Sequence, residues 1–330
     1  MKLAIVGNGK IVTECLFALQ DVPEIEVVSI WGRPTSLDRT KSLADDYGIM
    51  EVYTDYEKML TETNADTVYI GIINSLHYDY AKLALIAGKN VIVEKPFTAT
   101  AEQAKDLASI ALDHHLFIFE AMTVFHNETY EKIKETVPWL GRIRMVQCNF
   151  SQYSSRYQKY KDGFPAPAFQ LESYGGALMD INVYNINFVV GLFGQPEDVL
   201  YVANKGYNGI DVSGTLILVY KDFIAELVAC KDSDSESFII VQGEEGYFKV
   251  PDSANSLRGL DIFIGHGENI AKEEFRPKEI HHRMVQEFKD FVKAIETDDY
   301  EAVNASLSHS ISVCDILERA AESAGLRYGE

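Results

Sequence analysis

The sequence has few cysteines and no close pair of them, which argues against the zinc-binding domains that rely on such pairs. Four of the 330 residues are cysteine, at positions 15, 148, 230 and 314. No Cys-x-x-Cys pair occurs, so a zinc ribbon is unsupported and no metal site is expected. A chain of this length can bury a large core without disulfides or metals. Reduced thiols in a cytosolic protein are the simplest interpretation.

Long apolar runs are absent as well. Near the N-terminus only residues 3–6 are consecutively apolar before Gly7, too few for the apolar region of a secretory signal peptide. No other run approaches the ~20 residues of a membrane-spanning helix. The sequence therefore predicts a soluble, cytoplasmic protein.

Basic residues are scarce relative to acidic ones. The chain has 30 Lys and Arg against 50 Asp and Glu, a formal net charge of −20. Such a surface repels phosphate backbones and anionic lipids, so neither a nucleic-acid nor a membrane partner is expected. Hydrophobic residues at 47% and charged residues at 24% are typical of a folded globular protein. At about 150 residues per domain, the length predicts roughly two domains.

Short β-like runs alternate with helical ones in the first third of the chain. The predicted strands cover residues 3–6, 25–30, 68–73, 90–93 and 116–119, and the helices cover residues 10–20, 36–47, 76–87 and 101–114. This alternation predicts an α/β domain with a parallel sheet covered on both faces. Right-handed crossovers make such a sheet doubly wound.

The rest of the chain has a different pattern, with strands following one another through short turns. Predicted strands cover residues 142–152, 215–220, 223–229, 237–242 and 246–250, and predicted helices cover residues 177–192, 282–296 and 306–324. Consecutive strands joined by short turns favour an antiparallel sheet. We therefore predict two domains, residues 1–122 and residues 123–330.

A glycine-containing turn, Gly7-Asn8-Gly9-Lys10-Ile11-Val12, joins the first predicted strand to the first helix. This is the context of a dinucleotide site, because Gly7 allows a tight turn and Gly9 lets the backbone approach a pyrophosphate. The N–H groups at the start of the helix would then hold the anion. The third glycine position is occupied by Val12, and an ordinary strand-to-helix turn is the alternative.

The end of the second predicted strand selects between NAD and NADP. It reads Trp31-Gly32-Arg33-Pro34-Thr35-Ser36, with no acidic residue to hold ribose hydroxyls. Arginine presents a planar donor fork that suits a phosphate, and the two hydroxyls can add donors. NADP(H) is therefore favoured and NAD(H) is possible. The alternative is that Arg33 is solvated or stacks on the adenine.

Polar residues follow two more strands of the predicted sheet, Asn74 and His77 after one and Glu94 and Lys95 after the next. Ligands of such sheets bind beyond the carboxyl ends of the strands, so both loops should face one crevice. A lysine beside an apolar strand and a proline is partly desolvated, which favours proton transfer. A surface Glu–Lys pair is the alternative.

These motifs together resemble the Gfo/Idh/MocA family of NAD(P)-dependent oxidoreductases. The resemblance is carried by the glycine turn, NSLH at 74–77, AGKNVIVEKPF at 87–97 and GGALMDINVYN at 175–185. It implies an N-terminal Rossmann domain and a C-terminal α+β domain with an open, mostly antiparallel sheet. That sheet commonly packs against a second subunit, so the resemblance also implies a homodimer or homotetramer.

The resemblance implies roles for individual residues. Lys95 matches the family's catalytic lysine, Glu94 and His77 match positions that line the cofactor cleft, and Asn74 matches one near the ribose. Asp180 matches the acidic residue of the substrate helix.

Many members carry histidine four residues after that aspartate, whereas this chain has Tyr184, as in the dihydrodiol dehydrogenase and glucose-fructose oxidoreductase branch. Positions 180 and 184 share one face of a helix. A phenolate near a lysine ammonium is favoured and can exchange a proton with a substrate hydroxyl. A core tyrosine is the alternative.

The predicted activity is hydride transfer between a nicotinamide cofactor and a secondary alcohol or carbonyl of a sugar, polyol or cyclic diol. Two alternatives remain: a non-enzymatic regulatory protein that binds cofactor or sugar, and an NAD-dependent glycoside hydrolase. Ile73, Val124 and Asn127 depart from the family pattern, so substrate contacts are not carried over. The aromatic residues within positions 150–174 either cover a substrate, pack at a subunit interface or anchor their own loop.

Overall fold

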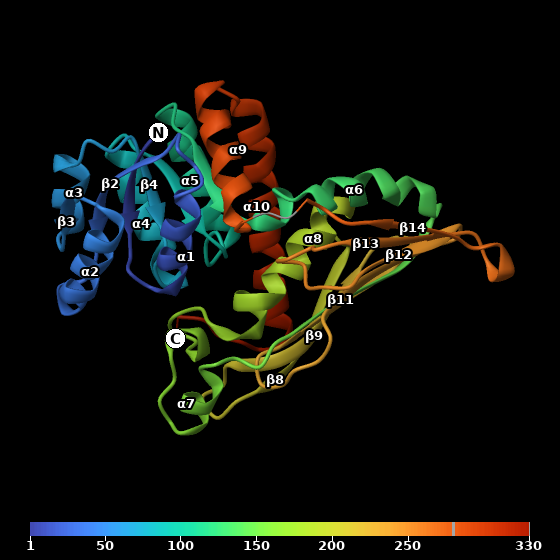
Figure 1. Ribbon diagram of the computed structural model, residues 1–330. Coiled ribbons are helices and arrows are strands. Elements are labelled where there is room, and N and C mark those ends of the chain that lie inside the picture. Colours follow the sequence, from blue (N-terminus) through green and yellow to red (C-terminus); the bar gives the residue numbers. More distant parts are fainter. Residues whose placement is uncertain (279–280, 330) are drawn as a thin grey trace. The chain divides into compact units, whose positions relative to one another are not determined.

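Figure 1 shows the computed structural model of the chain, which describes residues 1–278 and 281–329. The chain divides into two compact units, Met1–Met122 with Ile280–Cys314 and Thr123–Glu279 with Asp315–Glu330. Within the described ranges, no helix has both the length and the apolar character needed to cross a membrane.

The first unit is built on a six-stranded parallel sheet with the order β3-β2-β1-β4-β5-β6. Its strands are β1 (Lys2–Val6), β2 (Glu26–Trp31), β3 (Glu51–Tyr53), β4 (Thr67–Ile70), β5 (Asn90–Glu94) and β6 (Ile118–Ala121). Its helices are α1 (Lys10–Leu19), α2 (Leu37–Tyr47), α3 (Tyr56–Glu62), α4 (His77–Ile86), α5 (Ala101–Asp113) and α9 (Met284–Glu296). The predicted doubly wound parallel sheet is confirmed.

The central strands of this sheet are buried on both faces, as expected for continuous apolar runs. Helices α4 and α5 pack together, while α1 packs against α9. On α9, Phe288 lies 5.8 Å from the ring of Tyr69 on β4, and Phe291 stacks 4.6 Å from Phe119 on β6. A helix from the end of the chain therefore completes the core of the first unit.

The second unit contains an eight-stranded sheet with the order β14-β13-β12-β11-β7-β10-β9-β8. Its strands are β7 (Ile143–Ser151), β8 (Asp198–Lys205), β9 (Asp211–Val219), β10 (Ile224–Cys230), β11 (Phe238–Gly243), β12 (Gly246–Val250), β13 (Leu260–Ile264) and β14 (Ala271–Phe275). Only the β7–β10 pair is parallel among these described strands, and the others are antiparallel. The predicted open, mostly antiparallel sheet is confirmed.

Helices cover one face of this sheet. Helices α6 (Glu128–Thr136) and α8 (Val183–Phe193) lie over it, with α8 against β7 and β10 (Figure 1). The short helix α7 (Tyr157–Lys161) belongs to the aromatic segment. The last helix, α10 (Tyr300–Ser323), begins in the first unit and ends in the second. Buried residues alternate with more exposed ones along β10, so one face of the sheet remains open.

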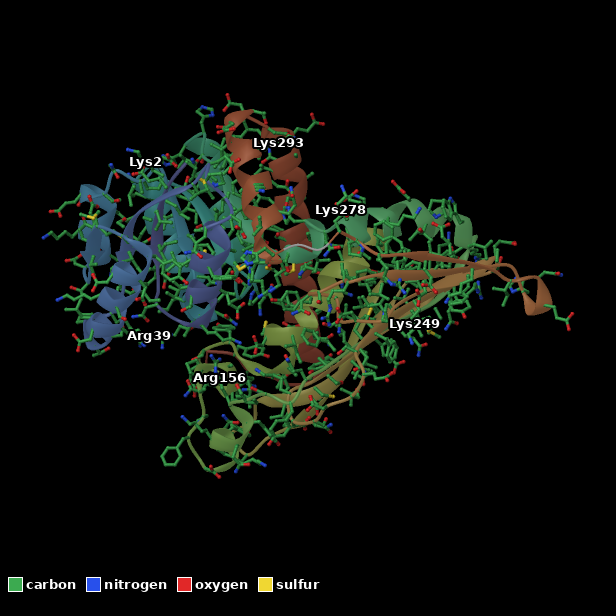
Figure 2. All side chains as sticks on the ribbon, in the orientation of Figure 1. Lys2, Arg39, Arg156, Lys249, Lys278 and Lys293 are labelled. Carbon is green, nitrogen blue, oxygen red and sulfur yellow. The ribbon has the colours of Figure 1, made fainter. Side chains whose placement is uncertain are left out.

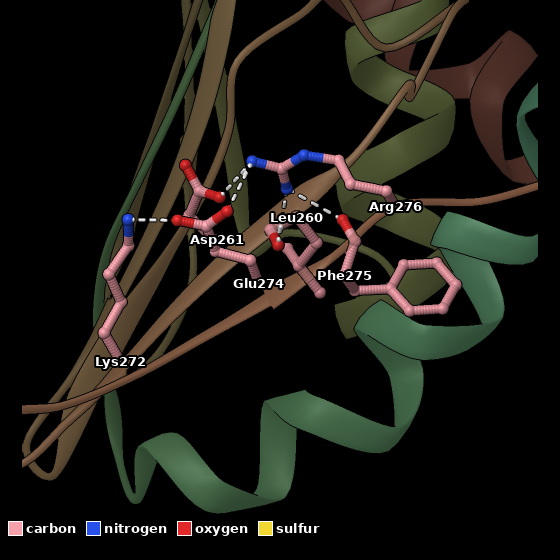
Figure 3. Close-up of polar contacts among 6 residues, drawn as sticks. All are labelled: Leu260, Asp261, Lys272, Glu274, Phe275 and Arg276. Carbon is pink, nitrogen blue, oxygen red and sulfur yellow. Dashed lines mark hydrogen bonds and ion pairs between the residues drawn. The ribbon is translucent and has the colours of Figure 1, made fainter.

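Charged side chains form ion pairs along the edge strand β14 and between the residue that follows it and β13. The guanidinium of Arg276 donates to Asp261 at 2.7 Å and to the carbonyl of Leu260 at 3.2 Å, and Lys272 pairs with Glu274 (Figure 3). Charged side chains on an edge strand oppose edge-to-edge pairing with another chain. This edge is therefore protected from the simplest form of aggregation.

Candidate functional site

The predicted glycine turn follows β1 directly. Gly7 has a φ of +115°, and a Cβ there would lie 2.4 Å from the carbonyl oxygen of Gly71. Gly9 is the N-cap of α1, where no side chain caps the helix, and a Cβ there would meet no atom within 4 Å. Lys10 is exposed and pairs with Glu14 at 3.5 Å. The space beside Gly9, at the uncapped N-terminus of α1, is therefore open.

Val12 occupies the position where the glycine motif usually has glycine or alanine, and Gly71 compensates for its bulk. A Cβ on Gly71 would lie 2.9 Å from Cγ2 of Val12 and 2.9 Å from Cε1 of Tyr69. Val12 is buried and Ile11 half-buried. The close helix–sheet packing that normally needs a small residue on the helix is achieved by glycine after β4. Nothing in the local motif identified Gly71.

Asn8 ties the glycine turn to the segment after β2. Its Nδ2 donates to Oγ of Ser36 and to Oγ1 of Thr40, both at 2.8 Å. Thr40 in turn donates to the carbonyl of Ser36 at 3.0 Å. The two loops predicted to hold the nucleotide are therefore fixed to each other.

Arg33, the residue predicted to select NADP, is exposed at the end of β2. Trp31 is buried, 5.3 Å from the ring of Tyr80 and 6.0 Å from that of Tyr56. A second exposed arginine, Arg39, lies in the first turn of α2 (Figure 2). Arg39 lies three residues after Ser36, outside the motif at 31–36, so that motif did not point to it.

The Glu-Lys-Pro-Phe loop, residues 94–97, follows β5 and is held from several sides. Glu94 is buried, accepts from the hydroxyl of Tyr69 at 2.7 Å and accepts from the N–H of Lys95 at 3.3 Å. Burial raises the pKa of Glu94 above its usual value. Lys95 itself is half-buried. Its backbone is therefore fixed, so its side chain starts from a defined position.

His77 holds the same loop from α4. The ring is completely buried, and its Nδ1 lies 2.9 Å from the carbonyl oxygen of Pro96. Its Nε2 lies 3.3 Å from the carbonyl oxygen of Ile72. Burial lowers the pKa of His77 to about 4, so the ring is neutral at pH 7 and serves as a hydrogen-bonding brace. Asn74 lies half-buried in the turn just before α4.

Glu120, at the end of β6, also holds the loop that contains Lys95, and the sequence gave no indication of this contact. One carboxylate oxygen accepts from the N–H of Phe97 at 3.0 Å, and the other accepts from Oγ of Ser310 on α10 at 2.6 Å. Burial raises the pKa of Glu120 to about 7. The loop that carries Lys95 is thus attached to the last helix of the chain.

In the second unit, two glycines precede the predicted substrate helix because neighbouring groups leave no room for a Cβ. A Cβ on Gly175 would lie 2.6 Å from the carbonyl of Pro167. Gly176 has a φ of +95°, and a Cβ there would lie 1.9 Å from Oδ1 of Asp211. Asp211 also accepts from the N–H of Leu178 at 2.6 Å. Asp211 on β9 therefore caps the first turn, and the motif itself gave no sign of it.

The helix begins with a π-helical turn, Leu178–Asn182, and continues as α8. Asp180 lies in this wide turn and Tyr184 in α8, so their spacing is not that of a regular α-helix as the sequence predicted. Oδ2 of Asp180 accepts from Nζ of Lys231 at 2.7 Å. Tyr184 is buried, with its ring 6.1 Å from that of Phe150.

The aromatic segment around α7 anchors its own loop. Tyr160 and Phe169 are buried in a small cluster with Ile210 and Val212. The rings of Tyr160 and Phe169 stack 5.0 Å apart. The loop-anchoring interpretation is confirmed for these two residues. Phe164, by contrast, is 75% exposed.

The carboxyl edge of the parallel sheet fits a dinucleotide. The open space at Gly9 and the uncapped N-terminus of α1 suit a pyrophosphate, because helix N–H groups and the helix dipole attract an anion. Lys95 follows β5 at the same edge. The edge thus combines a turn that suits an anion with a lysine whose backbone is held in place. Among residues 1–278 and 281–329, no group of three or more His, Cys, Asp or Glu is arranged to hold a metal ion.

Comparison with known protein families gives a match in each half of this chain. A model described as an oxidoreductase family with an NAD-binding Rossmann fold matches residues 1–121, and the GFO/IDH/MocA C-terminal domain matches residues 130–249. The scyllo-inositol 2-dehydrogenase (NADP(+)) IolU of Bacillus subtilis is 30% identical over 99% of this chain and 98% of its own length. The chain belongs to the Gfo/Idh/MocA oxidoreductase family. The predicted family and the predicted enzyme class, a nicotinamide-dependent oxidoreductase, are therefore confirmed.

Other relatives extend this result. The trans-1,2-dihydrobenzene-1,2-diol dehydrogenase of Xenopus tropicalis is 26% identical over 99% of both chains. The relatives of this chain thus include a dihydrodiol dehydrogenase, from the branch expected from Tyr184, as well as an inositol dehydrogenase. KijD10, a 3-ketoreductase from Actinomadura kijaniata solved with NADP and TDP-benzene, superposes with a TM-score of 0.84 at 20% identity, covering 98% of this chain and 97% of its own. That likeness shows the shared fold.

The predicted site residues fall in the two units. Gly7–Ile11, Trp31, Arg33, Asn74, His77, Glu94 and Lys95 belong to the first, and Asp180 and Tyr184 to the second. Within the first unit, His77 and Glu94 hold the loop of Lys95 directly. The pairing of Lys95 with Tyr184, and the cofactor contacts of the individual residues, stay predictions.

Proposed function

We propose that the protein transfers a hydride between NADP(H) and a secondary alcohol or carbonyl group of a sugar, polyol or cyclic diol. The observation that carries this proposal is the fixed position of Lys95 after β5, at the sheet edge that also holds the open glycine turn. The substrate class is supported by relatives named for inositol and dihydrodiol dehydrogenation.

The nicotinamide ring, when bound, supplies the hydride-accepting or hydride-donating carbon. The residues of the chain then have to bind the nucleotide, orient the substrate and move one proton. The N–H groups at the start of α1 hold the pyrophosphate, and Gly9 leaves room for it. Because Glu94 and His77 fix the loop backbone, the Lys95 side chain extends from a defined position.

Tyr184 and Lys95 handle the proton in this proposal. In oxidation the substrate hydroxyl gives its proton to the phenolate of Tyr184 while the carbinol carbon loses the hydride, and in reduction both steps run backwards. Asp180 orients the substrate hydroxyl. The reaction requires no metal ion in this scheme.

NADP(H) is the proposed cofactor, with NAD(H) as the weaker alternative. Arg33 is exposed after β2, and Arg39 is exposed in the following helix. Two guanidinium groups near one strand end suit the 2′-phosphate better than the ribose hydroxyls alone. A relative named as NADP(+)-dependent supports the same choice.

We also propose the remaining features of the biological unit. Residues 1–122 bind the cofactor, with α9 and the start of α10 packed in the same unit, and the rest of residues 123–330 serves substrate binding and oligomerisation. The open face of the sheet in the second unit packs against another copy to give a homodimer or homotetramer. The cytoplasm is the proposed location, supported by four free cysteines, three of them buried.

A fluorescence titration of the full chain with NADPH and with NADH tests the cofactor proposal. Arg33→Ala should weaken NADPH binding by about tenfold or more and leave NADH binding unchanged, since a charge-assisted hydrogen bond contributes about 1.5–3 kcal/mol. Arg156→Ala, at an exposed arginine of the second unit, is the matched control (Figure 2). A preference for NADH in the wild type contradicts the phosphate site.

A panel of sugars, polyols and cyclic diols, followed by NADPH absorbance in both directions, tests the reaction. Lys95→Met and Tyr184→Phe should each lower kcat by about 100-fold or more while nucleotide binding persists. Lys105→Met, at an exposed position of α5, is the control for the lysine variant. Tight NADPH binding without turnover of any member of the panel contradicts the proposed enzyme.

A further inference from the structure

Lys231 is a buried cation that the proposed reaction does not use. It follows β10 directly, and its side chain is 3% exposed. Its ammonium group donates to Oδ2 of Asp180 at 2.7 Å, to the carbonyl of Ala168 at 2.6 Å and to the carbonyl of Gly176 at 3.4 Å. An ammonium group has three N–H donors, so these acceptors use all of them.

A buried charge requires this degree of compensation. Moving an ammonium group out of water is strongly unfavourable unless the group is paired and hydrogen-bonded. Besides its three acceptors, Nζ lies 4.4 Å from the ring centre of Phe169, where the negative face of the ring adds attraction. The site therefore surrounds the lysine ammonium group with a carboxylate, two carbonyl oxygens and an aromatic ring.

The backbone of Lys231 is fixed on both sides. Its N–H donates to the carbonyl of Val212 at 2.8 Å, and its carbonyl accepts from the N–H of Ser154 at 2.9 Å. The Asp180 side chain is 37% exposed, in contrast to the buried lysine. The lysine is thus the rigid member of the pair, and the aspartate is the member that can reach a ligand.

We propose that Lys231 is the positioning residue of Asp180: it keeps that carboxylate ionised, holds it in one orientation and joins it to the aromatic segment through Ala168. The inference rests on the proposed function only for the role of Asp180 toward substrate. Lys231 does not exchange protons in the reaction, because its donors are occupied within the protein. It also joins three separate segments: the end of β10, the turn at 167–169 and the π-helical turn.

Other titratable groups near this pair come from β8, β9 and the C-terminal segment. Asp211 on β9 is buried and accepts from the hydroxyl of Tyr201 on β8 at 2.8 Å, while Tyr328 donates to its other oxygen at 3.4 Å. Burial raises the pKa of Asp211 to about 6. Asp211 is therefore the nearby carboxyl group whose titration must be separated from that of Asp180.

The direct test is an NMR titration of the full chain labelled with ¹³C at the aspartate carboxyl groups. Asp180→Asn and Asp211→Asn assign the two signals. Lys231→Met should move the titration midpoint of Asp180 to higher pH by about one unit or more, since a neighbouring cation lowers a carboxyl pKa by about 1–3 units. Lys231→Arg should keep the midpoint low. An unchanged midpoint in Lys231→Met overturns the proposal.

Two further variants are needed: one in case Lys231→Met does not fold, and one as a control for the substitution of a lysine by methionine. Lys231→Gln retains donors without the charge, so it should raise the midpoint as Lys231→Met does. Lys159→Met makes the same side-chain change at an exposed lysine of α7 and should leave the midpoint unchanged. If Lys231→Gln folds and titrates like the wild type, the charge of Lys231 has no such role and the proposal fails.

Kinetics then test whether Lys231 acts through Asp180. With the best substrate of the panel, Lys231→Met should lower kcat by about 10- to 100-fold and shift the acidic limb of its pH profile upward. In the Asp180→Asn background the same change should have little further effect. If each substitution lowers kcat by its own factor and the two factors multiply in the double variant, the residues act independently and the positioning role is overturned. If the wild type turns over no substrate, the proposed function fails, while the NMR titration still decides the role of Lys231.

Discussion

At the scale of single residues, the buried carboxyl group of Glu120, which holds the Lys95 loop, makes the stability of the protein depend on pH. Burial raises its pKa from 4.5 to about 7, so between these pH values the folded state holds more protons than the unfolded chain. The stability contributed by this group is fully present below about pH 4.5, falls as the pH rises toward about 7 and is lost above it. Integrated over that range, the loss is at most about 3 kcal/mol.

Glu120→Gln should therefore remove part of the pH dependence. Urea unfolding at several pH values between 5 and 8 measures it, and the difference between wild type and variant cancels the other buried carboxyl groups. The variant should lose less stability than the wild type as the pH rises. Parallel stability curves for the two proteins would contradict the raised pKa of Glu120.

Two glycines of the same sheet edge should respond in opposite ways to alanine. Gly9 has an ordinary φ of −76° and open space around its missing Cβ, so Gly9→Ala should leave stability unchanged but weaken NADPH binding. Gly71→Ala should destabilise the fold by about 1–3 kcal/mol, because its Cβ would overlap Val12 and Tyr69. Thermal unfolding and NADPH titration of both variants distinguish the two effects. Unimpaired NADPH binding by Gly9→Ala would exclude the assigned pyrophosphate position.

The sequence pointed to the candidate catalytic residues more readily than to the residues that hold them in place. Lys95 and Asp180 stand in contiguous motifs, so local pattern was sufficient to find them. The groups that fix these motifs are remote: Lys231 lies 51 positions from Asp180, and Asp211 lies 33 positions from Leu178. Single-sequence periodicity contains no information on such long-range pairs, and a lone lysine after a strand looks like any surface lysine.

At the scale of elements, length decided which strands and helices could be predicted. The central strands of the first sheet were found within a few residues because they are apolar on both faces. β3 has only three residues and pairs with β2 alone, so no period was visible. The π-helical turn before α8 was also not visible in the sequence, because the residues that contact it, Asp211 on β9 and Lys231 after β10, are far away in the chain.

Helix α5, which follows the Lys95 loop, has a capping arrangement that can be tested. Oγ1 of Thr100 accepts from the N–H of Gln103, and Oε1 of Gln103 accepts from the N–H of Ala99, both at 3.2 Å. Thr100→Ala should cost about 1 kcal/mol of stability, whereas Thr100→Ser should retain most of it. Urea unfolding measures both. Equal stability of the alanine variant and the wild type would show that this cap contributes nothing.

At the scale of the whole molecule, charge and apolar surface act in opposite directions on self-association. The net charge of −20 makes two copies repel each other, while Leu200 and Val202 expose apolar side chains on the open sheet face. Tyr247 and Phe263 stack 4.5 Å apart on adjacent strands of the same sheet. Burial of this face against a second copy would offset the repulsion, and added salt would screen it.

Sedimentation of the full chain should therefore show a mass of two or four times 37.1 kDa, with association strengthened by salt. Val202→Lys, at a residue 64% exposed on β8, should shift the protein to the 37.1 kDa monomer because it places a charge within the apolar face. Met50→Lys makes a similar change at a residue 90% exposed in the first unit and should leave the oligomer intact. A wild-type monomer at micromolar concentration, or equal dissociation by both variants, would exclude the open sheet face as the interface.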